Sequence, residues 1–207
     1  MVKNYIMPVI MVLILAIPCS SYGTEPLDAL RIPVDQVTAL LKDPKYQNPE
    51  QKELQREKIW EAITRVFDFR EMAKRALGRN WNKFTPEQRK EFTHLFSELL
   101  GNMYTTKMQG KYEDEKVVYL SQKIASGSKA RVKTKIVSRN MDIPVNYNMI
   151  KRNGSWKVYD VNIEGISLIK NYRSQFNQIL SKDSPTYLID RLKGKIEIQK
   201  KKRSEKN

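Results

Sequence analysis

Reactive side chains are scarce in this sequence of 207 residues. It contains one cysteine, Cys19, and one histidine, His94. Zinc sites of the Cys/His type, nucleophile–base pairs that need a histidine, and disulfide frameworks therefore lack their components. The eight glycines are spread along the chain, without the clustered spacing of a phosphate-binding loop, so nucleotide chemistry is not expected.

The apolar run near the N-terminus is too short to cross a membrane. It extends from Ile6 to Ile17, about a dozen residues where a transmembrane helix needs about 20. Lys3 precedes this run, and the small and polar residues Ser21-Tyr22-Gly23 follow it. This pattern predicts a cleavable signal peptide over residues 1–23 and hence an exported protein.

Acidic residues are the minority among the charges. The sequence has 38 Lys and Arg against 23 Asp and Glu, a formal net charge of +15. Removal of residues 1–23 takes away one lysine and no carboxylate, which leaves +14. Such an excess indicates an acidic partner or an anionic surface. Nucleic acid is disfavoured, because the aromatic residues that would stack on bases lie mostly on the apolar parity of the predicted strands.

The predicted elements are helices, then strands, then helices again. Residues 27–109 have helical periodicity, 115–163 have strand alternation, and 165–203 are again helical. This order predicts an α+β fold in a single domain, residues 24–199, with about four strands in a mainly antiparallel, curved sheet. Residues 200–207 form a highly charged end, which we expect to be a basic, disordered tail.

Local signals define several helix boundaries. A first helix over about 34–42 is predicted to stop at Asp43-Pro44, because a residue before proline is disfavoured in the α region. A second helix is predicted from about Pro49, and Asp68 is expected to cap a third that ends at Gly78. The second helix is predicted to bury the side chains of Trp60, Ile63 and Phe67.

The best-defined helix begins at Thr85. Thr85 is the N-cap, Pro86 occupies the first helical position and Gln88 completes a capping box. Its apolar residues form one helical stripe: Phe92, Leu95, Phe96, Leu99, Leu100, Met103 and Tyr104. His94 lies about 200° around the helix from Phe92 and is expected to face solvent.

The strand region has cations on one parity and apolar residues on the other. Arg131, Lys133 and Lys135 alternate with Val132 and Ile136, so one face of the sheet is predicted to be basic and the other apolar. The next strand continues the apolar face with Ile143, Val145, Tyr147 and Met149.

Turn signals and helical spacing organise the rest of the chain. Pro144 suggests an edge strand or a bulge, and Asn153-Gly154 is typical of a two-residue hairpin turn. Ser184-Pro185 opens a last helix. The apolar positions of the two C-terminal helices are Ile169, Tyr172, Phe176, Ile179 and Leu180, then Leu188, Leu192 and Ile196.

These observations leave the function open. Asp160 and Glu164 could act as an acid and a base, but carboxylates beside so many cations more often form surface pairs. The apolar helices and sheet face could form a solid core or leave an apolar cavity. Periodicity alone does not distinguish the two.

Two motifs resemble a known family. The first is FDFREMAKRALG at 67–78, followed by Trp81 and FTPEQRKEF at 84–92. The second is WKVYDV at 156–161, followed by EGISL at 164–168 and NYRSQF at 171–176. In this order, over about residues 27–195, they resemble the MlaC-like, or toluene-tolerance, family of periplasmic phospholipid-binding proteins.

The resemblance implies an NTF2-like fold with an apolar pocket between the sheet and the helices. It implies a periplasmic carrier that shuttles a phospholipid between the outer membrane and an inner-membrane ABC transporter, which maintains lipid asymmetry. The implied partners are the phospholipid cargo, the transporter complex with its lipid-binding subunit, and an outer-membrane lipoprotein/porin complex. No catalysis, cofactor, metal or nucleic acid is implied, and we expect a monomer.

Strand parity and helical spacing predict which residues line this pocket. The sheet is predicted to contribute Val117, Tyr119, Val132, Ile136, Val145, Tyr147 and Met149, and the helices Phe92, Phe96, Leu99, Ile169 and Tyr172. Two alternatives stay open. One is an envelope interaction module with a solid core that binds through its basic face. The other, less favoured, is an NTF2-like enzyme that acts on an apolar substrate.

Overall fold

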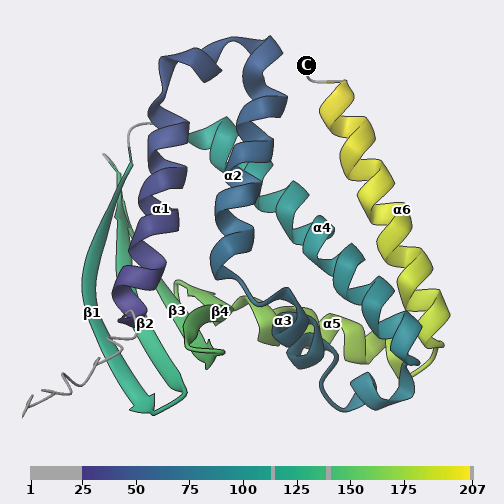
Figure 1. The fold of residues 1–207 in the computed structure, drawn as a ribbon. Coiled ribbons are helices and arrows are strands. Elements are labelled where there is room, and N and C mark those ends of the chain that lie inside the picture. Colours follow the sequence, from purple (N-terminus) through teal and green to yellow (C-terminus); the bar gives the residue numbers. More distant parts are fainter. Residues whose placement is uncertain (1–24, 113–114, 139–140, 206–207) are drawn as a thin grey trace, which may run out of the picture.

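The computed structural model describes residues 25–112, 115–138 and 141–205. The predicted signal peptide lies outside these residues. The described chain has the predicted α+β order, with N-terminal helices, an antiparallel sheet and C-terminal helices (Figure 1). None of the described helices combines the length and apolar character needed to cross a bilayer.

The first helix is longer than predicted. α1 spans Pro26–Lys42 and contains Pro33, whereas the sequence suggested a start near residue 34. Proline inside a helix removes one backbone hydrogen bond. Here Leu30 and Pro33 are both buried, and this packing outweighs the local preference. Two 3₁₀ turns, Pro44–Gln47 and Pro49–Gln51, lead from α1 to α2.

The buried face of α2 (Lys52–Val66) also differs from the prediction. Trp60, Ile63 and Phe67 are only partly buried. The face that packs inward consists of Gln55, Ile59, Ala62 and Val66. The predicted face was wrong because α2 lies between two neighbours, α1 on one side and α4 on the other, so its apolar residues do not form a single stripe.

The predicted boundaries of the next two helices are confirmed. α3 spans Phe69–Leu77, with Asp68 accepting a hydrogen bond from the Glu71 amide and Gly78 at the C-cap. A 3₁₀ segment, Gly78–Lys83, leads to α4 at Pro86–Lys111, which begins with the expected capping box. His94 faces solvent, with 76% of its side chain exposed.

Within the described residues, the sheet has five antiparallel strands in the order β1-β2-β3-β4-β5. Their bounds are Lys116–Ser126, Lys129–Val137, Asp142–Arg152, Ser155–Ile163 and Ile166–Ser167. The fifth strand, only two residues long, accounts for the difference from the four expected. In β2 the cations and apolar residues alternate as predicted, with Arg131 and Lys133 exposed and Val132 buried.

The hairpin at Asn153-Gly154 is confirmed, since both residues have positive φ, 47° and 80°, as a tight β-turn of this kind requires. β3 is an interior strand, so the edge suggested by Pro144 is wrong. Pro144 is tolerated because it lies beyond the last β3–β4 pair, Val145 with Ile163. The irregularity in this pairing is at Asn148 and Met149 instead.

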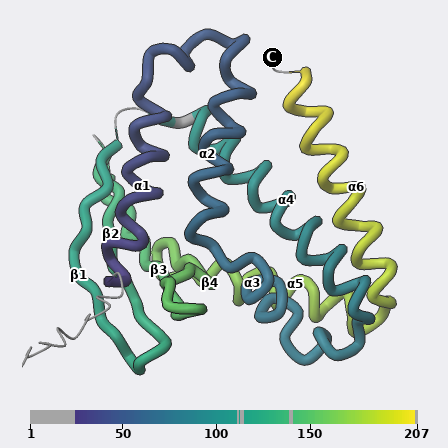
Figure 2. The backbone as a smooth tube through the Cα atoms, viewed as in Figure 1, coloured from purple at the N-terminus to yellow at the C-terminus, as the bar shows by residue number. Residues whose placement is uncertain are grey.

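The chain ends in two helices, α5 at Leu168–Leu180 and α6 at Pro185–Ser204. The last helix therefore continues to Ser204, whereas the sequence suggested a disordered tail from residue 200. In Figure 2, α1 runs beside the sheet and α2 packs along α1, while α4 and α6 pack along each other away from the sheet. The apolar core accordingly divides into two clusters.

Candidate functional site

The first cluster, called here the sheet cluster, lies between the apolar face of the sheet and the helices α1 and α2. Its buried members are Leu30, Val66, Ala130, Val132, Val145, Met149, Trp156, Val158 and Val161. Ile136 and Tyr147 pack against its margin and are partly buried. Five of the seven strand residues predicted to line a pocket therefore share one face.

The second cluster, called the helical cluster, is built by α3, α4, α5 and α6. It contains all five predicted helix residues: Phe92, Phe96, Leu99, Ile169 and Tyr172. The rings of Phe96 and Tyr172 meet edge to face with centroids 5.0 Å apart, and those of Phe92 and Phe96 stack at 5.7 Å. Such geometries are favourable for aromatic pairs, so this part of the predicted lining is closely packed.

Val117 and Tyr119 lie on β1, outside both clusters, and are partly buried. The Tyr119 hydroxyl donates a hydrogen bond to Asp35 of α1 at 2.8 Å, and the Arg31 guanidinium lies over its ring at 4.9 Å. Burial, and then the bond to Asp35, raise the pKa of Tyr119. Tyr119 therefore holds α1 against the edge strand.

Phe67 connects the two clusters, because it packs against both. Its ring stacks on Phe69 at 5.9 Å, and Phe69 in turn meets Trp60 at 5.1 Å. Phe67 also forms an isolated parallel bridge with Val158 of β4. This junction was not among the predicted lining residues. The available signal was its position at the start of the first motif.

Two tyrosines at the clusters keep their protons well above neutral pH. Burial raises the pKa of Tyr147 to about 12. Burial, with the nearby Tyr104, raises the pKa of Tyr172 to about 12. Within the described parts of the chain, the side-chain hydrogen bonds include none from either hydroxyl. Both groups are thus neutral donors beside apolar side chains.

A larger and a smaller cleft lie in the helical part of the described chain, and none of the twelve predicted residues lines either. The larger, about 800 Å³, lies between the 3₁₀ segment Gly78–Lys83 and α5 and has Arg79, Lys83 and Arg173 in its wall. The smaller, about 410 Å³, lies where α2, α4 and α6 meet. The apolar pocket between sheet and helices stays a prediction.

The two sequence motifs contact each other. The Asp68 amide donates to the Val158 carbonyl at 2.9 Å, and Arg173 Nε donates to the Arg75 carbonyl at 2.7 Å. Beside these contacts, Glu71 accepts a hydrogen bond at 3.0 Å from Arg152, which lies at the end of β3 and outside both motifs. The motifs therefore hold α3 against β4 and α5.

Asp160 organises the start of α5. Its carboxylate accepts hydrogen bonds from the Ser167 hydroxyl at 2.8 Å, the Ile169 amide at 3.1 Å and Asn148 Nδ2 at 3.3 Å. A buried carboxylate with three donors is well compensated. Glu164, by contrast, is exposed. In the described chain no group of three or more His, Cys, Asp or Glu side chains is placed to hold a metal ion.

Comparison with protein families matches residues 33–194 to the family described as MlaC protein. The chain belongs to the MlaC family. This confirms the resemblance seen in the two motifs. The matched region includes both clusters almost completely and omits the start of α1 and the end of α6.

Two curated relatives are similar to parts of this MlaC-family chain. The toluene tolerance protein Ttg2D of Pseudomonas putida is 29% identical over 102 residues, 49% of this chain and 47% of the relative. The intermembrane phospholipid transport system binding protein MlaC of Haemophilus influenzae is 24% identical over 123 residues, 57% of each chain. The chain thus matches about half the length of these relatives.

A solved structure has the same fold as this MlaC-family chain. It is a phospholipid-binding protein from Ralstonia solanacearum in complex with a phospholipid, with a TM-score of 0.73 and 24% sequence identity. The match covers 85% of this chain and 99% of the other. It confirms the α+β architecture.

Proposed function

We propose that the protein is a periplasmic phospholipid carrier. Membership of the MlaC family supports this proposal, as do the phospholipid-related names of the Haemophilus influenzae relative and the Ralstonia solanacearum neighbour. The structural observation that carries it is the junction at Phe67, where apolar clusters built by two different layers meet. An apolar interface between two layers can part to admit acyl chains.

The lipid would lie between the layers, against the twelve predicted residues. Ile136, Tyr147 and Val117 are partly buried and need little movement to contact a chain. Phe92 and Phe96 are fully buried, so the helical cluster must rearrange before lipid reaches them. The Tyr147 hydroxyl would donate to a polar oxygen of the lipid backbone, with the head group near cations at the mouth.

Such a cargo would leave the protein slowly without help. Two acyl chains contain ~30 methylenes, and at ~0.8 kcal/mol each their burial is a gross ~20 kcal/mol before ordering costs. Partners must therefore favour an open form of the protein. We propose an inner-membrane ABC transporter complex and an outer-membrane lipoprotein/porin complex in this role, with lipid asymmetry as the outcome. The proposal contains no catalytic step.

Lipid extraction tests the carrier directly. The protein, purified by mild methods and incubated with liposomes, is extracted with organic solvent, and phospholipid is measured by mass spectrometry and phosphate analysis. The proposal expects about one phospholipid per chain. Lipid in far less than stoichiometric amount, from protein that unfolds cooperatively, would overturn it.

The close packing of Phe92, Phe96 and Tyr172 favours a second candidate, an envelope interaction module with a solid core. Such a module would bind its partner equally well after removal of lipid, and its binding would weaken steeply with salt because its surface is strongly basic. A carrier would instead exchange lipid with its partner. Measuring both quantities on one preparation separates the two.

A further inference from the structure

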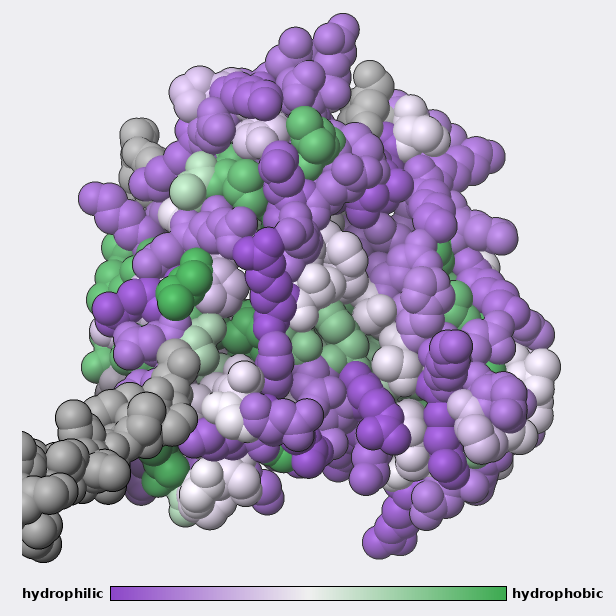
Figure 3. Space-filling view, in the orientation of Figure 1, coloured by the Kyte–Doolittle hydropathy of each residue, from purple (hydrophilic) through white to green (hydrophobic). Residues whose placement is uncertain are grey.

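None of the twelve residues predicted to contact lipid lines the cleft of about 410 Å³ between α2, α4 and α6. Figure 3 shows this face hollowed between α2 and α6, with side chains of intermediate hydropathy at the bottom and hydrophilic ones around them. The last turn of α6 contributes Arg203 to its wall, and α2 contributes Arg56. Two cations near the end of α6, Lys200 and Arg203, thus have a defined position in the wall of this cleft.

Two guanidinium groups converge in this cleft on one carboxylate. Arg56 binds Glu53 through Nε, 3.0 Å from each carboxylate oxygen, and also through Nη2. Arg203 Nε lies 3.6 Å from the same carboxylate. The two arginine side chains are only 19% and 23% exposed. Two mostly buried guanidinium groups therefore share the Glu53 carboxylate, whose hydrogen bond raises the pKa of Arg56, as do the nearby carboxylates of Glu57 and Glu98.

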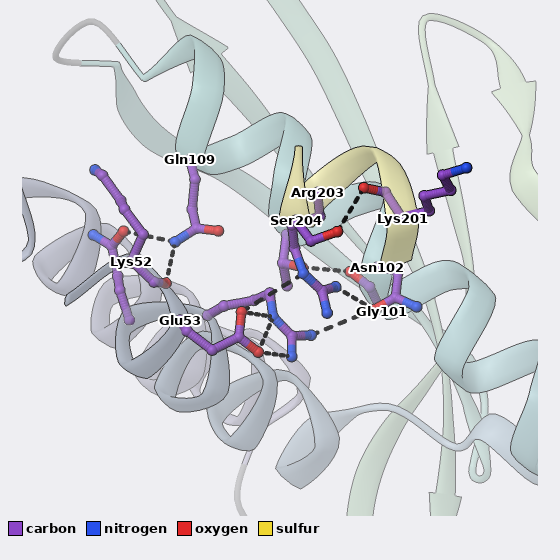
Figure 4. A network of polar contacts seen from close by, with 11 residues as sticks. Lys52, Glu53, Gly101, Asn102, Gln109, Lys201, Arg203 and Ser204 are labelled. Atoms are coloured by element: carbon purple, nitrogen blue, oxygen red, sulfur yellow. Dashed lines mark hydrogen bonds and ion pairs between the residues drawn. The ribbon is translucent and has the colours of Figure 1, made fainter. Parts of the chain in front are cut away.

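Asn102 of α4 adds a donor that lacks an acceptor. Its Oδ1 accepts from Arg56 Nη1 and Arg203 Nη1, each at 3.3 Å. Figure 4 shows Arg203 of α6 beside Asn102 of α4. These two bonds determine the orientation of the amide, because the reverse orientation would set its N–H groups against guanidinium N–H groups. Asn102 is 5% exposed, and its Nδ2 is buried without a hydrogen-bond partner.

An aromatic wall stands beside these donors. The Trp60 ring packs on Gly101 so closely that a Cβ at that position would lie 2.7 Å from Trp60 Cζ3. Both residues line the cleft. Lys200 and His94, at the rim, lie 2.8 Å and 3.9 Å from Glu98. The interior of the cleft thus presents guanidinium and amide donors. The Glu98 carboxylate at the rim is already paired with Lys200 and His94.

We propose that this cleft is a binding site for an oxyanion of the phosphate class, held by Arg56, Arg203 and the Asn102 amide. Guanidinium groups match the oxygens of phosphate with paired, charge-assisted hydrogen bonds. The bound group accepts hydrogen bonds from these donors and ties the end of α6 to α2 and α4. Free phosphate and the phosphate of a lipid head group have this chemistry in common. The proposal does not depend on lipid carriage.

Thermal unfolding of the full protein tests the site, with inorganic phosphate compared against chloride at equal ionic strength. We expect a saturable rise in melting temperature with phosphate only. Arg203→Ala should weaken the apparent affinity at least tenfold, and Arg203→Lys should weaken it less. The matched control is Lys202→Ala, which removes an exposed cation from the same turn and should leave the response unchanged. Phospholipid content, measured in parallel, keeps this result separate from the carrier proposal.

The source of the phosphate is tested by flotation with phosphatidylglycerol vesicles. Weaker vesicle binding by Arg203→Ala than by Lys202→Ala, with competition by inorganic phosphate, supports a head-group ligand. Equal vesicle binding together with a phosphate-specific thermal response supports a free anion. Equal responses to phosphate and chloride, or a full phosphate response in Arg203→Ala, would overturn the site.

Discussion

The guanidinium carbon of Arg75 lies 4.0 Å from the centroid of the Tyr159 ring. The two residues come from different sequence motifs, one on α3 and the other on β4. Arg75 also forms an ion pair with Glu71 at 2.7 Å, and its carbonyl accepts from Arg173 of α5. This one residue therefore connects three elements at the boundary between the helices and the sheet.

Replacing Arg75 should loosen this connection. Arg75→Ala removes a partly buried cation–π contact and an ion pair, so we expect a loss of ~1–2 kcal/mol in the free energy of unfolding. Urea denaturation measures it. Lys74→Ala, an exposed neighbour on the same helix, serves as the control and should change stability little. Equal losses in the two variants would contradict a specific role for Arg75.

Gly101 should tolerate no side chain. Gly101→Ala places a Cβ 2.7 Å from the Trp60 ring, and we expect it to destabilise the protein by ~1–3 kcal/mol through overpacking. Gly110 lies on the same helix with nothing within 4 Å of an added Cβ. Gly110→Ala should therefore stabilise the protein by ~0.5–1 kcal/mol. A stabilising Gly101→Ala would show that Trp60 moves aside freely.

Alkaline pH should destabilise the protein through Tyr147. Its pKa is raised from 10.0 to about 12 in the folded state, so the folded protein holds a proton that the unfolded chain releases. This contribution is complete below pH 10 and is lost as the pH rises toward 12. Unfolding free energies measured across this range should fall with pH, and Tyr147→Phe should reduce the slope. An unchanged slope would mean that Tyr147 ionises as in the unfolded chain.

Filling the margin of the sheet cluster should reduce lipid binding. Ile136 is partly buried at this margin, and Ile136→Trp would occupy space proposed for an acyl chain. We expect less phospholipid per chain, measured by phosphate analysis after extraction. Ile166→Trp makes the same change at a site that is 66% exposed and should leave the content unchanged. Equal lipid content in both variants, at equal unfolding midpoints, would argue against this location.

Local rules predicted the elements well where the signal lies in neighbouring residues. The capping box at Thr85, the cap at Asp68 and the turn at Asn153-Gly154 were confirmed, because each depends on bonds within a few residues. The start of α1 and the buried face of α2 were predicted wrongly. Both depend on packing against elements distant in the sequence, which overrides local propensity.

The candidate site shows the same contrast between features that neighbouring residues predict and features that depend on packing between distant elements. Parity correctly placed Val132, Val145 and Met149 together on the buried face of the sheet, and spacing placed Phe92 and Phe96 on one face of α4. Neither pattern contains the distance between these faces. The sequence patterns therefore could not predict the junction at Phe67 or the cleft around Asn102, since each combines residues from separate elements.

By itself, the sequence determined the α+β order, the two-sided strands and the family, because periodicity and short motifs are properties of neighbouring residues. Tertiary structure decided that the apolar residues form two clusters joined at Phe67, and that Arg56 and Arg203 meet on Glu53 and Asn102. Asn102 is 46 residues from Arg56 and 101 residues from Arg203 in the chain. Only the packing of whole helices, whose relative positions no local pattern encodes, brings such side chains within bonding distance.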